Sequence, residues 1–380
     1  MDFNFTPDQL ALQKMVRDFV DKEIIPHALE MDKEGVVKPD LWNKLDEAGL
    51  LNLTVPEEYD GPGLDALSIG IIYEELGRGC AGIATTVAAN ALASYPVVLL
   101  GSEEQKEKFF GVLNDGKLAA FALTEPGAGS DAGAVATTAV KDGDDHYILN
   151  GTKCFITNAG IADIYVIFAN TRKSAGIRGL TAFVVEKGAP GFTVGKEEEK
   201  MGIRASNTCE LILQDVRIPA SNRIGREGEG FKIAMKTLDA ARPFVGAVSL
   251  GIAQAAFELA VKYSKERVQF GKPIGSFQLV QAMLADMAIK VETARLMVYK
   301  ACWIKGFGEA STRDSAIAKC YAADVAMEVS TNALQVLGGY GYSKESPAEK
   351  YMRDAKIMQI YEGTNQIQRL VIANSILFDK

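Results

Sequence analysis

The chain has 380 residues, of which 48% are hydrophobic and 24% charged, and its formal net charge is −8. This length exceeds one ordinary core, so two or three domains are expected. The acidic balance, without a stripe of Lys or Arg, argues against a nucleic-acid partner. Five scattered cysteines and only two histidines give no metal-like spacing. We therefore predict no metal site, no disulfide framework and no Ser-His-Asp mechanism.

The N-terminus, Met1 to Phe5, lacks the basic and apolar segments of a secretion signal. The uncharged stretch from Cys80 to Ser102 contains Asn90, Pro96 and many small residues, and it is less apolar than a membrane-spanning helix should be. We expect a helix buried inside the protein, with Pro96 marking a break or a new helix start, and no membrane span. The expected location is the cytoplasm, although a processed mitochondrial matrix protein would look similar.

Residues 1–118 are predicted to form a helical domain. Thr6-Pro7 is a helix start, with a Thr cap and Pro in the first turn, and apolar residues follow it at helical spacing. Further helices are expected over Pro39–Leu51, Ala66–Leu76, Ala81–Gly101 and Glu103–Leu113.

Residues 119–228 carry nearly all of the strand signal and are predicted to form a β-domain. Strands are expected over Ala119–Leu123, His146–Leu149, Ile164–Ala169, Leu180–Val185 and Leu211–Ile218. The pair Asn150-Gly151 is expected to form a turn, because this dipeptide is typical of tight hairpins.

Residues 229–380 return to helical periodicity and are predicted to form a four-helix bundle. The long periodic runs are Phe231–Glu266, Gln278–Gly306, Ser311–Leu337 and Gln366–Ser375. The predicted fold class is therefore α+β, with a helical N-terminal domain, a middle β-domain and a C-terminal helical bundle. The junction between a bundle and a strand domain often holds a ligand.

The stretch Tyr361-Glu362-Gly363-Thr364-Asn365-Gln366-Ile367-Gln368 is suited to hold a catalytic base. Its glycine lets a ligand approach the backbone, and its hydroxyl and amide side chains can cap a helix or bind a polar group. A lone Glu before a helix is more often a solvated surface group. The motifs elsewhere in the chain therefore decide between the two interpretations.

Five further motifs are each weak alone. Leu123–Asp131 is a loop of small residues, but it lacks the spacing and the βαβ context of a dinucleotide fingerprint. Glu266–Pro273 is a charged loop that could clamp a diphosphate. The others are Phe155–Gly160, Leu238–Pro243 and the glycine-rich Gln335–Tyr342.

In their order and spacing, these motifs and the α-β-α layout resemble the acyl-CoA dehydrogenase family, most closely its short- and medium-chain members. The resemblance implies α,β-dehydrogenation of an acyl-CoA to the 2-enoyl-CoA, with FAD as cofactor and electron-transferring flavoprotein as acceptor. It identifies Glu362 as the base that abstracts the α-proton, while flavin N5 takes the β-hydride. Some relatives place the base where this chain has Ala241, which cannot act, so Glu362 is the candidate.

The resemblance also implies the binding residues. Expected FAD contacts are Phe121, Leu123, Thr124, Ser130, Phe155, Thr157, Arg267, Gln269, Phe270, Gln278, Gln335, Gly338, Gly339, Thr364 and Gln366. Expected substrate contacts are Ser130, Asp239, Arg242, Tyr361 and Gly363. In the family, the contacts corresponding to Arg267–Phe270 and Gln335–Gly339 come from a neighbouring subunit, which implies a homotetramer built as a dimer of dimers.

The substrate is expected to be a short- or medium-chain or cyclic acyl-CoA. The residues from Thr85 to Ser94 are mostly small and leave room for such a group, and Tyr95 is expected to close the base of the pocket. By resemblance, electron-transferring flavoprotein docks on the N-terminal helical domain. An enoyl-CoA reductase working with that partner and an oxidase remain alternatives. The net charge and the intact Glu362 argue against a non-catalytic or DNA-associated member.

Overall fold

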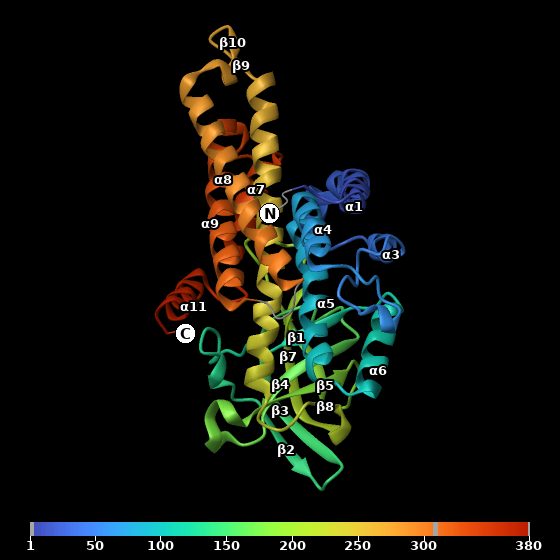
Figure 1. Ribbon diagram of the computed structural model, residues 1–380. Coiled ribbons are helices and arrows are strands. Elements are labelled where there is room, and N and C mark those ends of the chain that lie inside the picture. The colour runs from blue at the N-terminus through green and yellow to red at the C-terminus, as the bar shows by residue number, and fades with distance from the viewer. Residues whose placement is uncertain (1–3, 307–310, 379–380) are drawn as a thin grey trace.

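The computed structural model describes residues 4–306 and 311–378 (Figure 1). Its arrangement confirms the predicted fold class, with helices, then a mixed sheet, then helices along the chain. The division at residues 118 and 228 stays a prediction. The first helices are α1 (Pro7–Phe19), α2 (Ala28–Glu34), α3 (Pro39–Glu47), α4 (Ala66–Gly79), α5 (Ala81–Leu100) and α6 (Glu103–Asn114).

Helix α5 is buried, as predicted, but it does not break at Pro96. The fixed φ of proline is itself helical and the lost N–H costs one hydrogen bond, so a helix packed on all sides can continue through it. Both α5 and the later helix α7 (Gly230–Glu266) are long and apolar enough to cross a membrane by length and composition alone. The most apolar 18-residue segment of each helix is largely buried inside the protein, 78% of it in α5 and 72% in α7.

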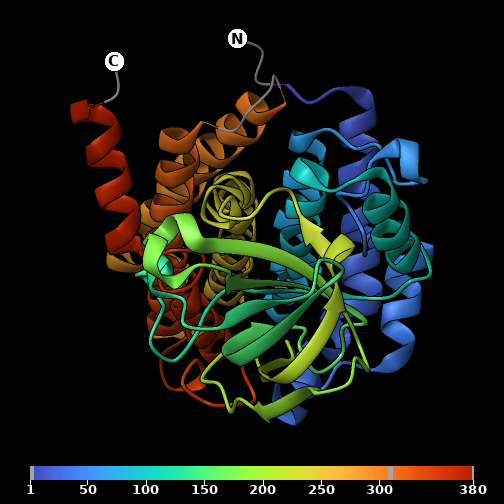
Figure 2. The ribbon, with the colours of Figure 1, turned by 90° about the horizontal axis from the view of Figure 1, so that it is seen from below.

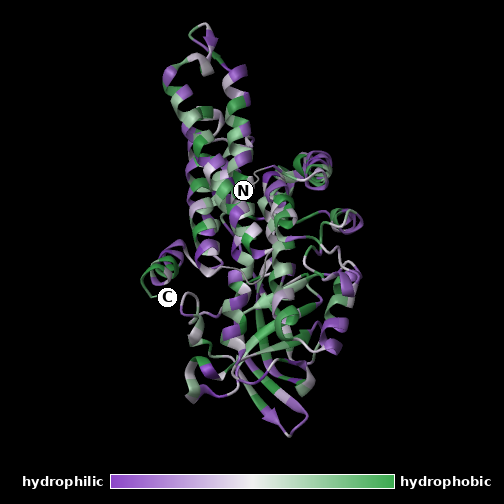
Figure 3. Ribbon diagram, viewed as in Figure 1, coloured by the Kyte–Doolittle hydropathy of each residue, from purple (hydrophilic) through white to green (hydrophobic). Residues whose placement is uncertain are grey.

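The middle of the chain folds into one eight-stranded sheet with the order β6-β7-β3-β2-β4-β5-β8, and β1 pairs with β4 in parallel. The strands are β1 (Ala119–Ala122), β2 (Thr138–Asp142), β3 (His146–Thr157), β4 (Ile164–Asn170), β5 (Leu180–Glu186), β6 (Phe192–Glu197), β7 (Thr208–Pro219) and β8 (Arg223–Ile224). The central strands are largely hydrophobic in Figure 3.

Strand β4 shows that both faces of the sheet are covered. All seven of its residues are buried. Alternate side chains of a strand point to opposite faces, so Ile164, Val166 and Phe168 enter the main core. Tyr165 and Ile167 enter a second, smaller core on the other face. Figure 2 shows the sheet lying across the end of the bundle, beside the N-terminal helices.

The predicted turn at Asn150-Gly151 is wrong, because β3 runs straight through it. The pairing of β3 with β7 shifts register between Leu149 and Gly151, which marks a bulge rather than a hairpin. A Cβ at Gly151 would lie 2.4 Å from Oγ1 of Thr137, so the glycine here permits a close approach of β3 to the residue that precedes β2.

The C-terminal helices are α7, α8 (Gln278–Lys305), α9 (Thr312–Leu337), α10 (Pro347–Met358) and α11 (Asn365–Phe378). Helix α7 runs from the sheet to the far end of the bundle, where the short strands β9 (Val268–Gln269) and β10 (Lys272–Pro273) form a hairpin (Figure 1). Helix α10 is not among the predicted helices. Lys350 and Asp354 are buried there as an ion pair, which obscures the apolar pattern of that helix.

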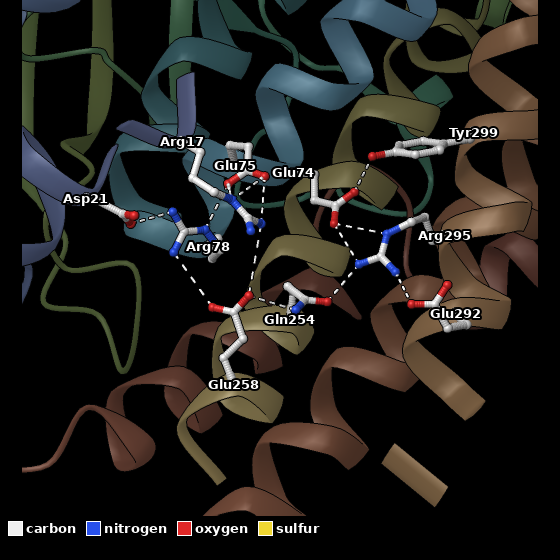
Figure 4. A network of polar contacts seen from close by, with 10 residues as sticks. All are labelled: Arg17, Asp21, Glu74, Glu75, Arg78, Gln254, Glu258, Glu292, Arg295 and Tyr299. Carbon is white, nitrogen blue, oxygen red and sulfur yellow. Dashed lines mark hydrogen bonds and ion pairs between the residues drawn. The ribbon is translucent and has the colours of Figure 1, made fainter. Parts of the chain in front are cut away.

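A polar network fastens the N-terminal helices to the bundle (Figure 4). Glu75 on α4 is fully buried, and its carboxylate accepts hydrogen bonds from Arg17 on α1 and Arg78 on α4. Glu74 beside it accepts from Arg295 and Tyr299 on α8. Because these buried charges are all partnered, the contact fixes how α4 packs between the two helical regions.

Candidate active site

A cavity of about 350 Å³ lies where α5, α7, the sheet and the segment before α11 meet. Thr85, Ala88, Ala89 and Leu92 of α5 form one wall, and Leu238, Arg242 and Val245 of α7 form another. The sheet and the loop after β1 contribute Phe121, Leu123, Thr124, Ser130, Phe155 and Thr157, and Tyr361, Glu362 and Gly363 also line the cavity. The structure thus brings the predicted base, Glu362, together with the predicted cofactor contacts from Phe121 to Thr157.

Glu362 lies on strained backbone at the cavity. Its φ is +54°, and Gly363 follows with a φ of +85°. A non-glycine residue in this left-handed region costs of order 1–3 kcal/mol, and such strain clusters at functional sites. The backbone favours glycine at position 363, and a Cβ there would lie 2.5 Å from Nε2 of Gln368, so that this side chain would have to move.

The Glu362 carboxyl group is poised to exchange a proton near neutral pH. Its Oε2 atom is buried and has no hydrogen-bond partner among the described residues. Burial raises the pKa of Glu362 to about 7, against the opposing charges of Lys319 and Arg242. A carboxylate that is desolvated but not hydrogen-bonded is a stronger base than a solvated one.

Two buried side chains hold this loop: Gln368, at the end of the predicted stretch, and Lys319, which the sequence did not reveal. Lys319 on α9 donates to the carbonyl of Gly363 at 2.8 Å and to Oδ1 of Asn365 at 3.1 Å. Gln368 on α11 donates to the carbonyls of Glu362 and Gly363 at 3.1 and 3.0 Å. The available signal was a lone Lys in the small, apolar run from Ala316 to Ala323.

The wall formed by α7 carries the predicted pair Asp239 and Arg242, which form an ion pair. Thr312 donates to the second oxygen of Asp239 at 2.6 Å. Arg242 is buried, and its Nε has no hydrogen-bond partner among the described residues. Burial lowers the pKa of Arg242, opposed by Asp239 and Glu362. A cation with a free donor at the cavity can bind a carbonyl or an anionic group.

The sheet wall presents an aromatic side chain and hydroxyl groups to the cavity. Phe155 has a φ of +55° and a side chain that is 65% exposed, which is unusual for a large apolar group. Behind this wall, Lys153 is fully buried and donates to the carbonyl of Leu123 at 3.2 Å and to Glu125 at 2.7 Å. This ion pair fixes the loop that displays Thr124.

The second group of predicted contacts is not brought to this cavity. Arg267, Gln269, Phe270, Gln278, Gln335, Gly338 and Gly339 lie at the end of the bundle that carries β9 and β10. The guanidinium of Arg267 stacks over the ring of Tyr340 at 5.2 Å, which joins the two segments of this group. Phe270 is 93% exposed. Within one chain, these residues cannot complete the site.

The remaining predicted residues have separate placements. Thr364 accepts a hydrogen bond from the N–H of Ile367 at 3.2 Å, and Gln366 is exposed; neither lines the cavity. Tyr95 was expected to close the pocket, but this is wrong: Leu92, one helical turn earlier, lines it instead. The Nζ atom of Lys305 lies 4.6 Å from the centre of the Tyr95 ring.

Comparison with known proteins identifies the family. Three family models match: acyl-CoA dehydrogenase N-terminal domain over residues 6–117, middle domain over 120–216 and C-terminal domain over 228–377. The chain is 50% identical to a short-chain specific acyl-CoA dehydrogenase of Megasphaera elsdenii, covering 99% of this chain and 100% of that protein. It is 47% identical to an NADH-dependent acryloyl-CoA reductase of Anaerotignum propionicum, covering 99% and 96%.

Solved structures agree. The butyryl-CoA dehydrogenase of Megasphaera elsdenii matches with a TM-score of 0.97 and 50% identity over 99% of this chain and all of that one. A chain of the structure described as electron transferring flavoprotein of Acidaminococcus fermentans matches with a TM-score of 0.97 and 51% identity over the whole of both. The resemblance predicted from the motifs is confirmed, and the chain belongs to the acyl-CoA dehydrogenase family.

Proposed function

We propose that this chain catalyses the α,β-dehydrogenation of a short-chain acyl-CoA such as butyryl-CoA, with Glu362 as the base. The carrying observation is the buried, unpartnered Oε2 of Glu362 on the cavity wall. The short-chain substrate is supported by the relatives that are named short-chain specific and butyryl-CoA dehydrogenases. Leu92 and Val245 are larger apolar residues that line the cavity together with the small residues of α5.

The chemistry requires a base in a dry site. The α-proton of a thioester is weakly acidic, so the carboxylate must have its pKa raised toward the working pH. Donors must also face the thioester oxygen as charge develops there, and we assign this role to the backbone N–H of Glu362. The Asp239–Arg242 pair is proposed to bind the CoA portion, with Ser130, Tyr361 and Gly363 as further contacts.

The sheet wall fits a flat, polar-edged ring system such as the flavin of FAD. The exposed face of Phe155 can stack on a ring, while the hydroxyl groups of Thr124 and Thr157 can bond its edge. When bound, FAD supplies the hydride acceptor. Phe121, Leu123 and Ser130 would hold the cofactor on the same wall, and Thr364 and Gln366, which lie outside the cavity, would contact its adenosine end.

The far end of the bundle would serve a cofactor bound to another copy of the chain. The exposed Phe270 and the stacked Arg267 support this, since both lie away from the cavity of their own chain. We therefore propose a homotetramer, built as a dimer of dimers, in which Gln269, Gln278, Gln335, Gly338 and Gly339 also contact the neighbour's FAD.

We propose electron-transferring flavoprotein as the electron acceptor, docked on the N-terminal helical domain, and the cytoplasm as the location. A likeness to a chain from a structure described as that partner supports the pairing. The second candidate function is enoyl-CoA reduction with the same partner. The 47% identity to an acryloyl-CoA reductase supports this second candidate.

Anaerobic reduction of the bound flavin by a panel of acyl-CoAs tests the proposed function. The panel runs from butyryl-CoA to palmitoyl-CoA and includes branched and cyclohexane-carboxyl thioesters. We expect butyryl-CoA to bleach the flavin fastest. If no acyl-CoA bleaches it and an enoyl-CoA reoxidises the chemically reduced enzyme, the reductase function replaces the dehydrogenase one.

Substitution of Arg267 tests the shared cofactor site. We expect Arg267→Ala to weaken FAD retention and the tetramer together, because one side chain would serve both. Retained flavin after gel filtration and the mass by light scattering measure the two effects. Arg217→Ala is the control, since Arg217 is an exposed arginine of the sheet that pairs with Asp142. A variant that stays a yellow tetramer would rule out this role of Arg267.

A further inference from the structure

The strained loop of the base is anchored to one buried ammonium group. Lys319 is fully buried on α9, where it bonds the Gly363 carbonyl and the Asn365 side chain. Asn365 is itself fixed, since its Nδ2 donates to the Cys320 carbonyl at 3.0 Å and to Asp324 at 2.8 Å. Among the described residues, no carboxylate lies within ion-pair distance of the Lys319 ammonium. A buried cation without such a partner destabilises the folded protein unless another nearby charge of opposite sign stabilises it.

That other charge is Glu362. Burial lowers the pKa of Lys319 to about 8, and the largest opposing influence is the Glu362 carboxylate. In turn, Lys319 is the strongest influence that lowers the pKa of Glu362 against its burial. The two groups therefore stabilise each other's charged forms, without a direct ion pair that would neutralise the base.

We propose that Lys319 is a positioning residue for the base: its ammonium group fixes the left-handed backbone at Glu362 and Gly363 and stabilises the ionised Glu362 carboxylate. This inference rests on the proposed role of Glu362. It explains how a residue with a φ of +54° stays in place, since Lys319 and Gln368 together satisfy the carbonyls of the turn.

Other charged and titratable groups face this pair from each neighbouring element. Arg242 approaches Glu362 from α7, Tyr361 adjoins it in the loop, and Asp131 lines the same cavity from the sheet side. Cys320 and Asp324 face Lys319 on α9. Of these, Arg242 has the same sign as Lys319, so the loss of Lys319 leaves Glu362 with one nearby cation rather than two.

The test is the pH dependence of kcat for butyryl-CoA oxidation, measured with the FAD-loaded enzyme and a dye acceptor. Lys319→Met removes charge and donor at similar volume, while Lys319→Gln removes the charge but keeps a donor. In both variants, the rise of kcat with pH should occur about one pH unit higher than in wild type, because the Glu362 carboxylate loses a nearby cation. The kcat ratio to wild type is then about 0.1 at low pH and recovers toward pH 9. Lys319→Met should also lower the plateau, because its loop carbonyls lose a donor.

Lys350→Met is the matched control, since Lys350 is a buried lysine on α10 paired with Asp354. It should lower the melting temperature without moving the pH at which kcat rises. A kcat reduced by the same factor at every pH in both Lys319 variants would overturn the inference, because it would indicate a purely structural role. If wild type itself fails to oxidise any acyl-CoA, the proposed function fails instead, and the two failures are distinguished.

Discussion

Two glutamates beside the cavity show how surroundings shift the pKa of a buried carboxyl group in opposite directions. Glu125, next to Thr124, is 6% exposed, and its oxygens accept from Lys153 at 2.7 Å, Thr137 N–H at 3.0 Å and Ala136 N–H at 2.6 Å. Those bonds lower its pKa despite burial. Glu362 is held through its backbone, and its Oε2 has no described partner. Hydrogen bonding to the carboxylate, rather than burial alone, decides which glutamate can take a proton.

The largest expected effect concerns Glu362. Glu362→Gln should lower kcat by about 10³-fold or more, because general-base catalysis commonly contributes 10²–10⁴-fold. FAD retention and acyl-CoA binding should persist, since the amide has nearly the same shape. Flavin absorbance and stopped-flow reduction measure these properties. Activity within tenfold of wild type would end the comparison, because Glu362 would then not be the base.

Glu125→Gln should act on stability instead. It leaves the fully buried Lys153 without its ion-pair partner, and breaking a buried pair costs about 3–5 kcal/mol. We expect a melting temperature several degrees lower, with kcat per bound flavin at 25 °C falling far less than in Glu362→Gln. Thermal unfolding followed by circular dichroism checks this. A variant as stable as wild type would show that the Glu125 network is not structural.

The two glutamates should also have opposite effects on stability as pH changes. The folded pKa of Glu362 lies above its ordinary 4.5, at about 7, so its contribution becomes less favourable as pH rises from 4.5 to 7. Glu362→Gln should therefore be more stable than wild type at pH 8, by up to about 3 kcal/mol, and nearly equal at pH 5.

For Glu125 the sign reverses. Its folded pKa lies below 4.5, so its stabilisation is present above that pH and is lost as pH falls through the folded pKa. Melting temperatures of FAD-loaded wild type and Glu362→Gln between pH 5 and 8 test the predicted pH dependence for Glu362 directly. A Glu362→Gln advantage that does not grow with pH would contradict it.

The smallest expected effect is a single hydrogen bond. Thr137→Val removes the hydroxyl that donates to Glu125 but keeps the backbone N–H and the side-chain shape. We expect a loss of about 1 kcal/mol of stability and an unchanged kcat. The melting temperature should fall less than in Glu125→Gln. A larger fall than in that variant would mean that Thr137 has a further role.

The sequence predicted the α-β-α order, because the change from helical to alternating periodicity near residue 118 is strong. The family resemblance indicated Glu362 as the base, and the structure places that residue at the cavity. The sequence did not reveal Lys319 and Lys153, since a single lysine in a helix or strand is normally a surface group. Both are fully buried, and each holds a loop through contacts distant in sequence. Such contacts leave no local pattern.

Local signals also failed where tertiary packing overruled them. Asn150-Gly151 has the composition of a hairpin turn, but β3 continues through it because β7 pairs on both sides of the bulge. Pro96 is typical of a helix break, but it is buried within α5, and the helix continues to Leu100. The FAD contacts at the far end of the bundle, such as Arg267 and Gly338, were predicted by resemblance. Within a single chain they lie away from the cavity, so one chain alone does not test them.

The most direct test of the central claim is the protonation state of Glu362. Infrared difference spectra of FAD-loaded wild type minus Glu362→Gln, recorded across pH 5 to 9, isolate the carbonyl band of this one carboxylic acid. We predict that the protonated band disappears with a midpoint near pH 7. A midpoint near the ordinary value of 4.5 would contradict the account, because Glu362 would then be solvated or paired and no better placed than any surface glutamate.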